Sequence, residues 1–314
     1  MNKYRMTTKQ YWNLLINRNA GEKGKRIHFL VPNFHIGSAI TRGCQISGQL
    51  NKLGIYSRVF ELDYRPKKLE QVKDSIFIIV KAASQNSADI FSILKKNGNI
   101  LIWDPLDSLV ELRSDPEARM FDGVIFMNDQ CIGETADYFR KDCRYGVVPH
   151  HWDKRCRVNH ASRYKLLYFG DTTPENIAPE HIREIKNLHC LRCNSEQLFI
   201  DLLQEIRDYN CHFSVREDHS ESFKYKPAVK LSFASATDSN IILSRDYSNL
   251  ELLDASYPYY TSGDLKSVKE AVAYSKETYG SKIWESALDM IRKVRKRTSI
   301  ESVCRDYIQL AKCF

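Results

Sequence analysis

The chain has 314 residues, of which 43% are hydrophobic and 27% charged, and its formal net charge is +8. This balance predicts a packed core and excludes a chain that is disordered throughout. No apolar run approaches the roughly 18 residues of a membrane helix, and the N-terminal residues contain no signal-peptide core. Nine cysteines at irregular spacing favour reduced thiols over a disulfide framework. We therefore expect a cytoplasmic protein.

The first half of the chain alternates short apolar runs with helical patterns, after a polar lead-in over residues 1–25. Two of the helical segments end at Gly54 and Gly98, and glycine is suited to a helix C-terminus. Strands are expected at "RIHFLV" (26–31), "YSRVFEL" (56–62), "SIFIIV" (75–80), "NILIWD" (99–104), "GVIFMN" (123–128) and "YGVVP" (145–149). Continuous apolar strands alternating with helices predict a parallel sheet covered on both faces.

A second alternation begins after a polar linker over residues 150–163. Strands are expected at 164–171, 211–217 and 240–244, and helices at 194–209, 227–236, 264–276 and 284–314. The sequence therefore predicts an α/β fold with two Rossmann-like domains, 1–150 and 151–285, followed by C-terminal helices over 286–314. Because ligands of open α/β sheets bind beyond the carboxyl ends of the strands, we expect the site in a cleft between the two domains.

Two features could indicate a metal or a large anionic partner. The close pair Cys190 and Cys193 lacks the second pair of a zinc ribbon, so we expect no metal and no cofactor. The run "RKVRKR" is typical of a solvated helix face, and it would also suit an anionic membrane surface or nucleic acid. Because no nucleic-acid-binding signature accompanies it, we expect no nucleic-acid partner. The membrane-contact candidates are Arg292, Lys293, Arg295, Lys296 and Arg297.

In the first domain, the candidates for chemistry follow predicted strands. Gly37 and Ser38 lie where the first loop turns into a helix, and small residues there let backbone N–H groups approach an anion or a sugar. A tight turn without a ligand is the alternative. His35 in the same loop and Asp104 at the end of the fourth strand are the candidate general bases. A loop histidine and a turn-forming aspartate are the corresponding structural interpretations.

In the second domain, cations gather where a helix is expected to begin. Arg216 ends a strand, Lys226 precedes Pro227 at the predicted helix start, and Lys230 lies one turn further on the same side. A helix N-terminus with two ammonium groups and a guanidinium nearby predicts a diphosphate site, with a solvated lysine pair as the alternative. The hydroxyls of Ser244 and Tyr247, after the next strand, could complete the pocket.

The segment "KPAVKLSFASATDSNIILS" (226–244) resembles the donor-binding segment of GT-B-fold glycosyltransferases, in which the pattern is roughly K-P-x-x-K-L-x-E-A-x-A-x-G-x-P-V-I-x-S. The resemblance departs from the family at Phe233, Asp238 and Asn240, where the family has glutamate, glycine and proline. The family glutamate usually holds the donor ribose. The resemblance implies an N-terminal acceptor domain, a C-terminal nucleotide-sugar domain and helices that cross back to the first domain.

By this resemblance, the chain is expected to transfer a sugar from a nucleotide-sugar to a hydroxyl of a glycan or lipid-linked acceptor without a metal. Lys226, Lys230 and Arg216 would meet the phosphates, with help from the backbone near Gly37 and Ser244. An inverting reaction would use His35 or Asp104 as the base, and a retaining reaction would need neither. Because Phe233 replaces the family glutamate, the alternative is an inactive glycosyltransferase-like protein that serves in binding or assembly.

Overall fold

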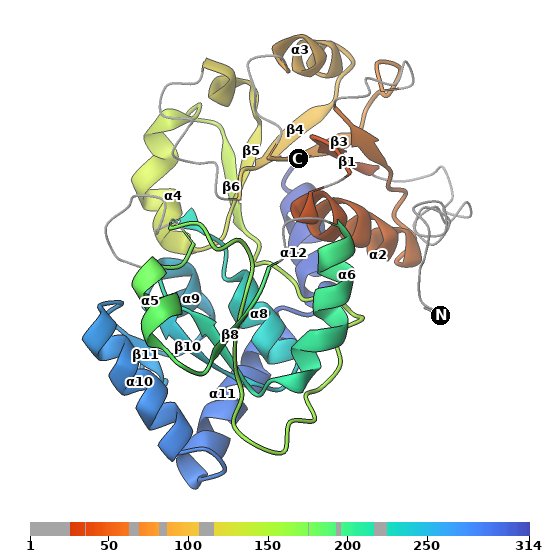
Figure 1. The fold of residues 1–314 in the computed structure, drawn as a ribbon. Coiled ribbons are helices and arrows are strands. Elements are labelled where there is room, and N and C mark those ends of the chain that lie inside the picture. The colour runs from red at the N-terminus through yellow and green to blue at the C-terminus, as the bar shows by residue number, and fades with distance from the viewer. Residues whose placement is uncertain are drawn as a thin grey trace. The chain divides into compact units, whose positions relative to one another are not determined.

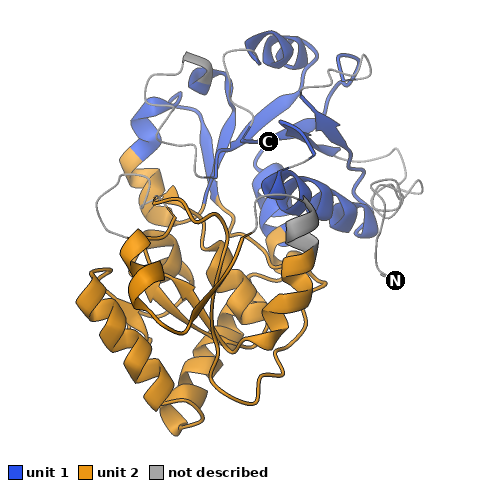
Figure 2. Ribbon diagram, viewed as in Figure 1, with its two compact units in different colours: residues 1–126, 135–146, 304–314 blue, residues 127–134, 147–303 orange. Residues whose placement is uncertain are grey.

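The computed structural model describes residues 26–34, 36–62, 69–81, 87–106, 116–174, 176–192, 196–216 and 225–314. These residues belong to two compact units, which Figure 2 shows in different colours. The first unit contains residues 1–126, 135–146 and 304–314, and the second contains 127–134 and 147–303. Each unit is built around one sheet (Figure 1). The polar lead-in over residues 1–25 and the candidate base His35 lie outside the described residues.

The first unit contains a six-stranded sheet in the order β2-β1-β3-β4-β5-β6. The pairs from β2 to β5 are parallel, and β1 and β3 are buried along their whole length. The strands are β1 (Ile27–Val31), β2 (Val59–Glu61), β3 (Ile76–Val80), β4 (Ile100–Asp104), β5 (Gly123–Phe126) and β6 (Arg144–Val147). The expected strand at 56–62 is shorter in the structure, and the other five lie where the apolar runs predict them.

The helices of the first unit pack where small or apolar residues allow contact with the sheet. They are a π-helix (Ala39–Gln45), α2 (Ile46–Lys52), α3 (Ala88–Lys96) and the 3₁₀ helices Pro116–Met120 and Ala136–Tyr138. Gly43 permits the close approach of the π-helix, since a Cβ there would lie 2.8 Å from the Val31 side chain. Gly54 and Gly98 follow α2 and α3 with positive φ, as predicted from their positions.

The end of the chain belongs to the first unit. Helix α12 (Ile300–Lys312) begins in the second unit, and its residues from Cys304 onward pack in the first. The Tyr307 ring lies 5.7 Å from the Phe29 ring, and Gly146 leaves room for Leu310. The C-terminal segment is therefore part of the core around β1 and β6.

The second unit contains a five-stranded sheet in the order β11-β10-β9-β7-β8, and all its pairs are parallel. The strands are β7 (Leu166–Phe169), β8 (Leu188–Leu191), β9 (Cys211–Ser214), β10 (Asn240–Ser244) and β11 (Tyr260–Thr261). The expectations for β7, β9 and β10 are confirmed. Strands β8 and β11, the two outermost strands of this sheet, were not predicted from the sequence.

Helices of the second unit begin at residues that satisfy their free N–H groups. Asp246, Asp264 and Ser281 each accept a hydrogen bond from the backbone N–H three residues later. The helices are α4 (Asp129–Thr135), α5 (Pro179–Glu184), α6 (Glu196–Glu205), a 3₁₀ turn (Ile206–Asp208), α8 (Val229–Ala236), α9 (Tyr247–Leu252), α10 (Leu265–Glu277) and α11 (Lys282–Arg297). Helix α4 comes from the first half of the sequence, but its residues up to Glu134 belong to the second unit, and only Thr135 belongs to the first.

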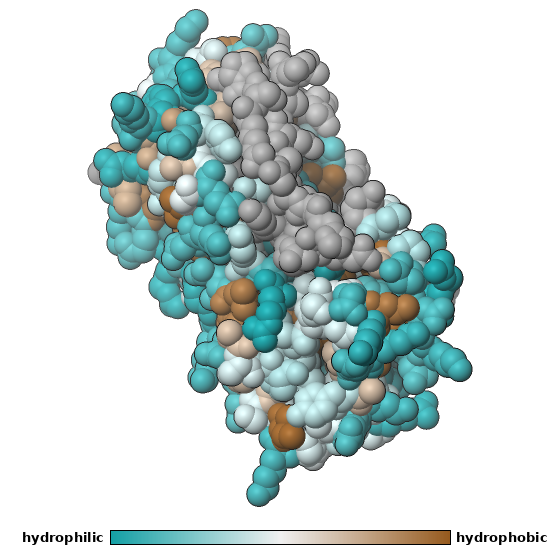
Figure 3. All heavy atoms as spheres, turned by 90° about the vertical axis from the view of Figure 1, so that its left-hand side faces the viewer, coloured by the Kyte–Doolittle hydropathy of each residue, from teal (hydrophilic) through white to brown (hydrophobic). Residues whose placement is uncertain are grey.

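The expected α/β fold with two parallel, helix-flanked sheets is confirmed. No helix among the described residues is long and apolar enough to span a membrane. On the face shown in Figure 3, hydrophobic residues form small separate groups among hydrophilic ones. Exposed apolar side chains such as Leu53, Val158 and Ile283 are normal when they are scattered singly.

Candidate functional site

The carboxyl ends of β7, β9 and β10 bring the second-unit candidates together. Parallel strands place these ends at one edge of the sheet, where open α/β sheets bind ligands. The chain leaves β7 at Gly170, β9 at Val215 and β10 at Arg245. Gly170 has a φ of 128°, a conformation that is strained for residues with a Cβ. A Cβ at Gly170 would lie 3.5 Å from the Lys230 ammonium, so β7 and the start of α8 are adjacent here.

Helix α8 begins at Val229, two residues later than predicted. Ala228 is the residue before the helix, and it provides no side-chain cap. The first N–H groups of a helix have no partner within the helix, and they carry the positive end of its dipole. Lys226 therefore precedes the helix, whereas Lys230 lies in its first turn. As predicted, two lysines lie at the start of a helix, although the helix begins two residues later than expected.

The two lysines have different surroundings. The Lys226 ammonium donates to Asn176 Oδ1 at 3.2 Å, which ties the entry to α8 to the loop after β7. The Lys230 ammonium lies 4.8 Å from the Tyr168 ring centroid and 5.8 Å from that of Phe169. Both lysines are half-buried. They are thus held against this edge of the sheet, unlike a freely solvated pair.

Arg216 and the buried Asp246 form the second part of the cluster. Arg216 Nη1 lies 3.3 Å from Asp246 Oδ2, and the Asp246 side chain is fully buried. Burial raises the pKa of Asp246 to about 6, although the positive charges of Arg216 and Lys230 oppose this shift. Asp246 also accepts from the backbone and side-chain N–H groups of Asn249. Asp246 is therefore a positioning residue, which fixes Arg216 relative to the start of α9.

The hydroxyl of Ser244, at the end of β10, has no hydrogen-bond partner among the described residues although its oxygen is buried. Such a group is costly unless a water or a ligand satisfies it. Its backbone C=O is used, since it accepts from Asn249 Nδ2 at 3.0 Å. Ser244 thus offers a free hydroxyl at the edge of the sheet that carries the cations.

Tyr247 lies in the first turn of α9, and its hydroxyl donates to Glu134 Oε1 at 3.4 Å. Glu134 Oε2 accepts from the Tyr225 hydroxyl at 3.2 Å. Nearby, Asn128 Nδ2 donates to Ser248 Oγ at 3.2 Å. The segment 127–134 therefore adds a carboxylate and an amide beside the residues predicted from the second half.

Phe233 is buried in a hydrophobic cluster of the second unit. Its ring lies 5.6 Å from the ring of Phe169, and it packs with residues of α6 such as Leu202. Asp238 has a φ of 54°, so it adopts the left-handed backbone for which the family has glycine. The side chain at position 233 is thus part of the packing between α8 and the sheet.

The first-unit candidates fall into two groups. Gly37 is exposed, its carbonyl accepts from the Thr41 hydroxyl at 2.9 Å, and Ser38 precedes the π-helix without a side-chain cap bond. These positions leave the backbone at the start of the π-helix accessible. The π-helix was not predicted from the sequence, and this form occurs frequently at functional sites.

Asp104 is fully buried in a charged cluster. Its Oδ2 lies 2.7 Å from Arg42 Nε and accepts from the Tyr307 hydroxyl at 2.8 Å. Burial is the largest single influence on the pKa of Arg42 and lowers it, but the charge and hydrogen bond of Asp104, together with Tyr307 and Asp306, outweigh burial, so this pKa is raised. Because the exposed fraction of Asp104 is 0%, this carboxylate has no open path to a substrate hydroxyl in this structure. The geometry favours the structural interpretation of Asp104 over the general base.

Some residues of the basic run at the end of α11 are engaged in contacts within the second unit. Arg292 pairs with Asp238 and Asp289, and the Arg295 guanidinium lies 5.7 Å from the Trp152 ring. Lys293 and Lys296 are exposed, and Arg297 is half-buried. Only part of the run is thus available as a solvated positive face.

No group of three or more His, Cys, Asp or Glu side chains that could hold a metal occurs among the described residues. Cys190 is a half-buried free thiol, and Cys193 lies outside the described residues.

Three side chains that bond directly to the predicted site residues Lys226, Tyr247 and Arg216 were not themselves predicted from the sequence: Asn176, Glu134 and Asp246. Only Asp246 has a local signal, because an aspartate three residues before Asn249 at the start of a helical pattern indicates an N-cap. The other two are brought to the site by the fold.

No protein-family model and no curated protein matches the chain. Solved structures share its fold, and those that follow cover 92% of it. HepE from Anabaena, solved with UDP-glucose, has a TM-score of 0.62 at 10% identity over 99% of its own chain. Sucrose-phosphate synthase from Thermosynechococcus elongatus has a TM-score of 0.61 at 11% identity over 99% of its chain. A glycosyltransferase from Rickettsia africae has a TM-score of 0.56 at 10% identity over 98% of its chain. The chain therefore has the GT-B fold that its sequence resembles.

Proposed function

We propose that the chain is a glycosyltransferase that moves a sugar from a nucleotide-sugar donor to a hydroxyl of a glycan or lipid-linked acceptor, without a metal. The observation that carries the proposal is the cluster of Arg216, Lys226 and Lys230 at the carboxyl edge of the second sheet. Among solved structures of this fold, HepE was obtained with UDP-glucose and with UDP and glucose. That likeness and the three cations together support a nucleotide-sugar as the donor of this chain.

The chemistry assigned to the cations is stabilisation of the leaving group. When the bond between the sugar and the diphosphate breaks, negative charge develops on the diphosphate. Ammonium and guanidinium groups fixed at that position before the reaction stabilise the charge, as a metal ion would. Lys230 in the first turn of α8 adds its charge to the helix dipole, and we assign to Ser244 Oγ a hydrogen bond to a phosphate oxygen.

The nucleoside part of the donor needs a different partner from the family glutamate, because Phe233 is buried. Glu134 is an exposed carboxylate beside Tyr247 at the start of α9. We assign hydroxyl recognition on the donor side to Glu134 and Tyr247. In the first unit, the backbone at Gly37 and Ser38 is assigned to the donor phosphates or sugar, and His35 remains the candidate base for an inverting reaction.

The experiment is turnover of a panel of uridine, guanosine, cytidine and thymidine diphosphate sugars. Release of the nucleoside diphosphate from one donor, with or without an acceptor, is the expected result. Binding of a donor without release under any condition would instead support the inactive, glycosyltransferase-like binding protein. No binding and no release with the whole panel would refute the nucleotide-sugar assignment.

For location, we propose a cytoplasmic protein that contacts an anionic membrane through the exposed lysines of α11. Near such a surface each lysine or arginine contributes about 1 kcal/mol. Sedimentation with anionic vesicles is expected, and Lys293→Gln with Lys296→Gln should reduce it. Equal sedimentation of the variant and the parent would exclude this surface.

A further inference from the structure

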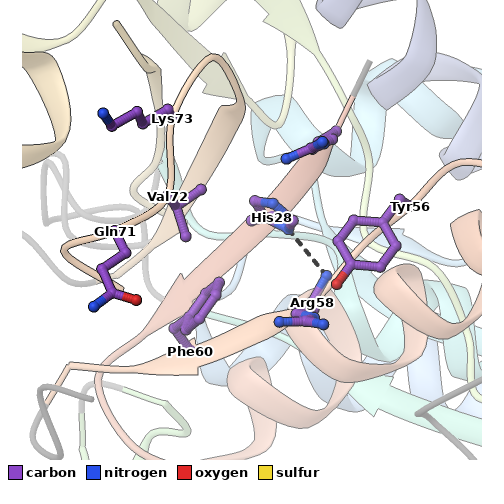
Figure 4. Close-up of a pocket in the computed structure, with 8 residues that line it drawn as sticks. His28, Tyr56, Arg58, Phe60, Gln71, Val72 and Lys73 are labelled. Atoms are coloured by element: carbon purple, nitrogen blue, oxygen red, sulfur yellow. Dashed lines mark hydrogen bonds between the residues drawn. The ribbon is translucent and has the colours of Figure 1, made fainter. Parts of the chain in front are cut away.

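A pocket lies on one face of the first sheet, over β1 and β2 and against the segment before β3 (Figure 4). The cavity volume is about 440 Å³. The lining residues are Arg26, His28, Tyr56, Arg58, Phe60, Gln71, Val72 and Lys73. All of them belong to the first unit, whereas Arg216, Lys226 and Lys230 belong to the second.

Strand alternation explains how these residues come to share one face. Arg26 and His28 are two residues apart, as are Tyr56, Arg58 and Phe60, and side chains two apart point to the same side of a strand. Phe29 pairs with Val59 in the parallel register, which sets His28 beside Arg58. Since β2 is the outermost strand, this face carries a polar and aromatic set at the edge of the sheet.

The pocket is positively charged. Arg26, Arg58 and Lys73 are its cations, and no carboxylate is among the lining residues. No ion pair joins any of the three to a carboxylate within the part of the chain that the structure describes. Three uncompensated cations around one hollow repel one another, and a bound anion would relieve that repulsion.

The floor and wall of the pocket are aromatic. His28 is 2% exposed, and its ring contacts Tyr56 and Phe60 edge-on at centroid distances of 5.7 Å each. His28 Nδ1 accepts the Arg58 backbone N–H at 3.2 Å, so the neutral ring carries its proton on Nε2. Burial lowers the pKa of His28 to about 3, with contributions from Arg58 and Arg26. The imidazole is thus a neutral, rigid part of the floor.

The guanidinium of Arg58 lies over the Tyr56 ring at 5.0 Å, which holds the cation at the rim. Guanidinium groups bind phosphate oxygens in a bidentate manner, and an ammonium adds a point charge. Aromatic faces beside them suit a ring. A phosphate monoester, which carries nearly two negative charges, matches three cations better than a single carboxylate does.

We propose that this pocket is a second ligand site, which binds a phosphate monoester carried by a ring, such as a sugar phosphate or a nucleoside monophosphate. Arg26, Arg58 and Lys73 hold the phosphate, and Tyr56 and Phe60 contact the ring. The site is accessory, because its residues lie before β1, β2 and β3 and at the start of β1, reaching only to Phe60 in β2, and not at the carboxyl end of β1, where the loop with Gly37 and Ser38 begins.

The test is an NMR titration of the full chain with glucose 6-phosphate, uridine monophosphate, inorganic phosphate and glucose. Glucose 6-phosphate or uridine monophosphate should shift the amide signals of residues 26–28 and 56–60, and the stronger of the two identifies the source of the ring. Inorganic phosphate should bind more weakly, and glucose should cause no shift there. Arg58→Gln with Lys73→Gln should weaken the binding at least about tenfold.

The matched controls separate this site from the donor site. Arg58 and Lys73 are exposed, so their replacement should leave the fold intact. The variant Lys52→Gln, which removes an exposed cation outside the pocket, should bind the phosphate ligands as the parent does. Lys226→Ala with Lys230→Ala should leave the shifts unchanged even if it abolishes nucleotide-sugar binding. Absence of shifts with every phosphate, or unchanged shifts in the Arg58 and Lys73 variant, would overturn the proposal. Equal binding of inorganic phosphate would overturn the role of the ring.

Discussion

The buried cluster of Arg42, Asp104 and Tyr307 makes a strong prediction about stability. The ion pair is fully buried on both sides, and removing one partner of such a pair costs about 3–5 kcal/mol because a charge is left uncompensated. Asp104→Asn should therefore destabilise the protein by that amount. Tyr307→Phe removes only a hydrogen bond to a charged group, and should cost about 1.5–3 kcal/mol.

The measurement is urea unfolding of the two single variants and the double variant, with turnover of the donor measured on the folded protein. Phenylalanine at position 307 retains the ring contacts with Phe29 and with the Arg42 guanidinium, so it isolates the hydroxyl. The double variant should lose less than the sum of the two single variants, because both changes act on the same carboxylate.

The result that would refute this reasoning is specific. If Asp104 were the catalytic base, Asp104→Asn would fold with parental stability and lose turnover, and Tyr307→Phe would affect neither quantity. Parental stability of Asp104→Asn would therefore restore the general-base hypothesis. Additive losses in the double variant would show that Tyr307 does not act through the carboxylate.

Three further predictions concern the second unit. Ser244→Ala should leave the free energy of unfolding unchanged or slightly higher, because a buried unpartnered hydroxyl is removed, but donor affinity should fall; a fall in both quantities would contradict a ligand-binding role. Gly170→Ala should destabilise the unit by about 1–3 kcal/mol through backbone strain at a φ of 128°, measured by urea unfolding, and parental stability would contradict the strain. Burial lowers the pKa of His212 to about 3, so its contribution is present above the unfolded pKa of about 6.5 and is lost as the pH falls, by about 2 kcal/mol at about pH 5. His212→Phe should remove that part of the acid sensitivity in parallel urea titrations, and an unchanged pH dependence would refute it.

The central strands of both sheets could be predicted from the sequence because they are buried on both faces. Strand β3 is a continuous apolar run, and β10 contains the apolar residues 241–243 between Asn240 and Ser244. The observed bounds of both strands agree with the predicted ones to within about one residue. Strand β8 (Leu188–Leu191) was missed, because it is an outer strand of four partly exposed residues. A half-exposed short strand lacks the hydrophobic signal that a buried one provides.

The candidate site was only partly predictable, for a different reason. The lysines of α8 have a local pattern, Lys-x3-Lys with a proline between, so the sequence alone indicates them. Asp104 looks accessible in the sequence, yet Arg42 and Tyr307, which bury and pair it, lie 62 and 203 positions away. Contacts over such separations in sequence depend on the completed fold, and no local sequence pattern indicates them.

The central claim is that the cations of the second sheet hold the diphosphate of a nucleotide donor, and isothermal titration calorimetry tests it most directly. The parent chain should bind one of the uridine, guanosine, cytidine or thymidine diphosphates. Lys226→Ala with Lys230→Ala should weaken that binding at least about tenfold, since charge-assisted phosphate contacts are lost. The matched control, Lys266→Ala with Lys282→Ala, removes two exposed lysines of the same unit and should bind as the parent does. No binding of any diphosphate by the parent, or undiminished binding by the Lys226 and Lys230 variant, would contradict the claim.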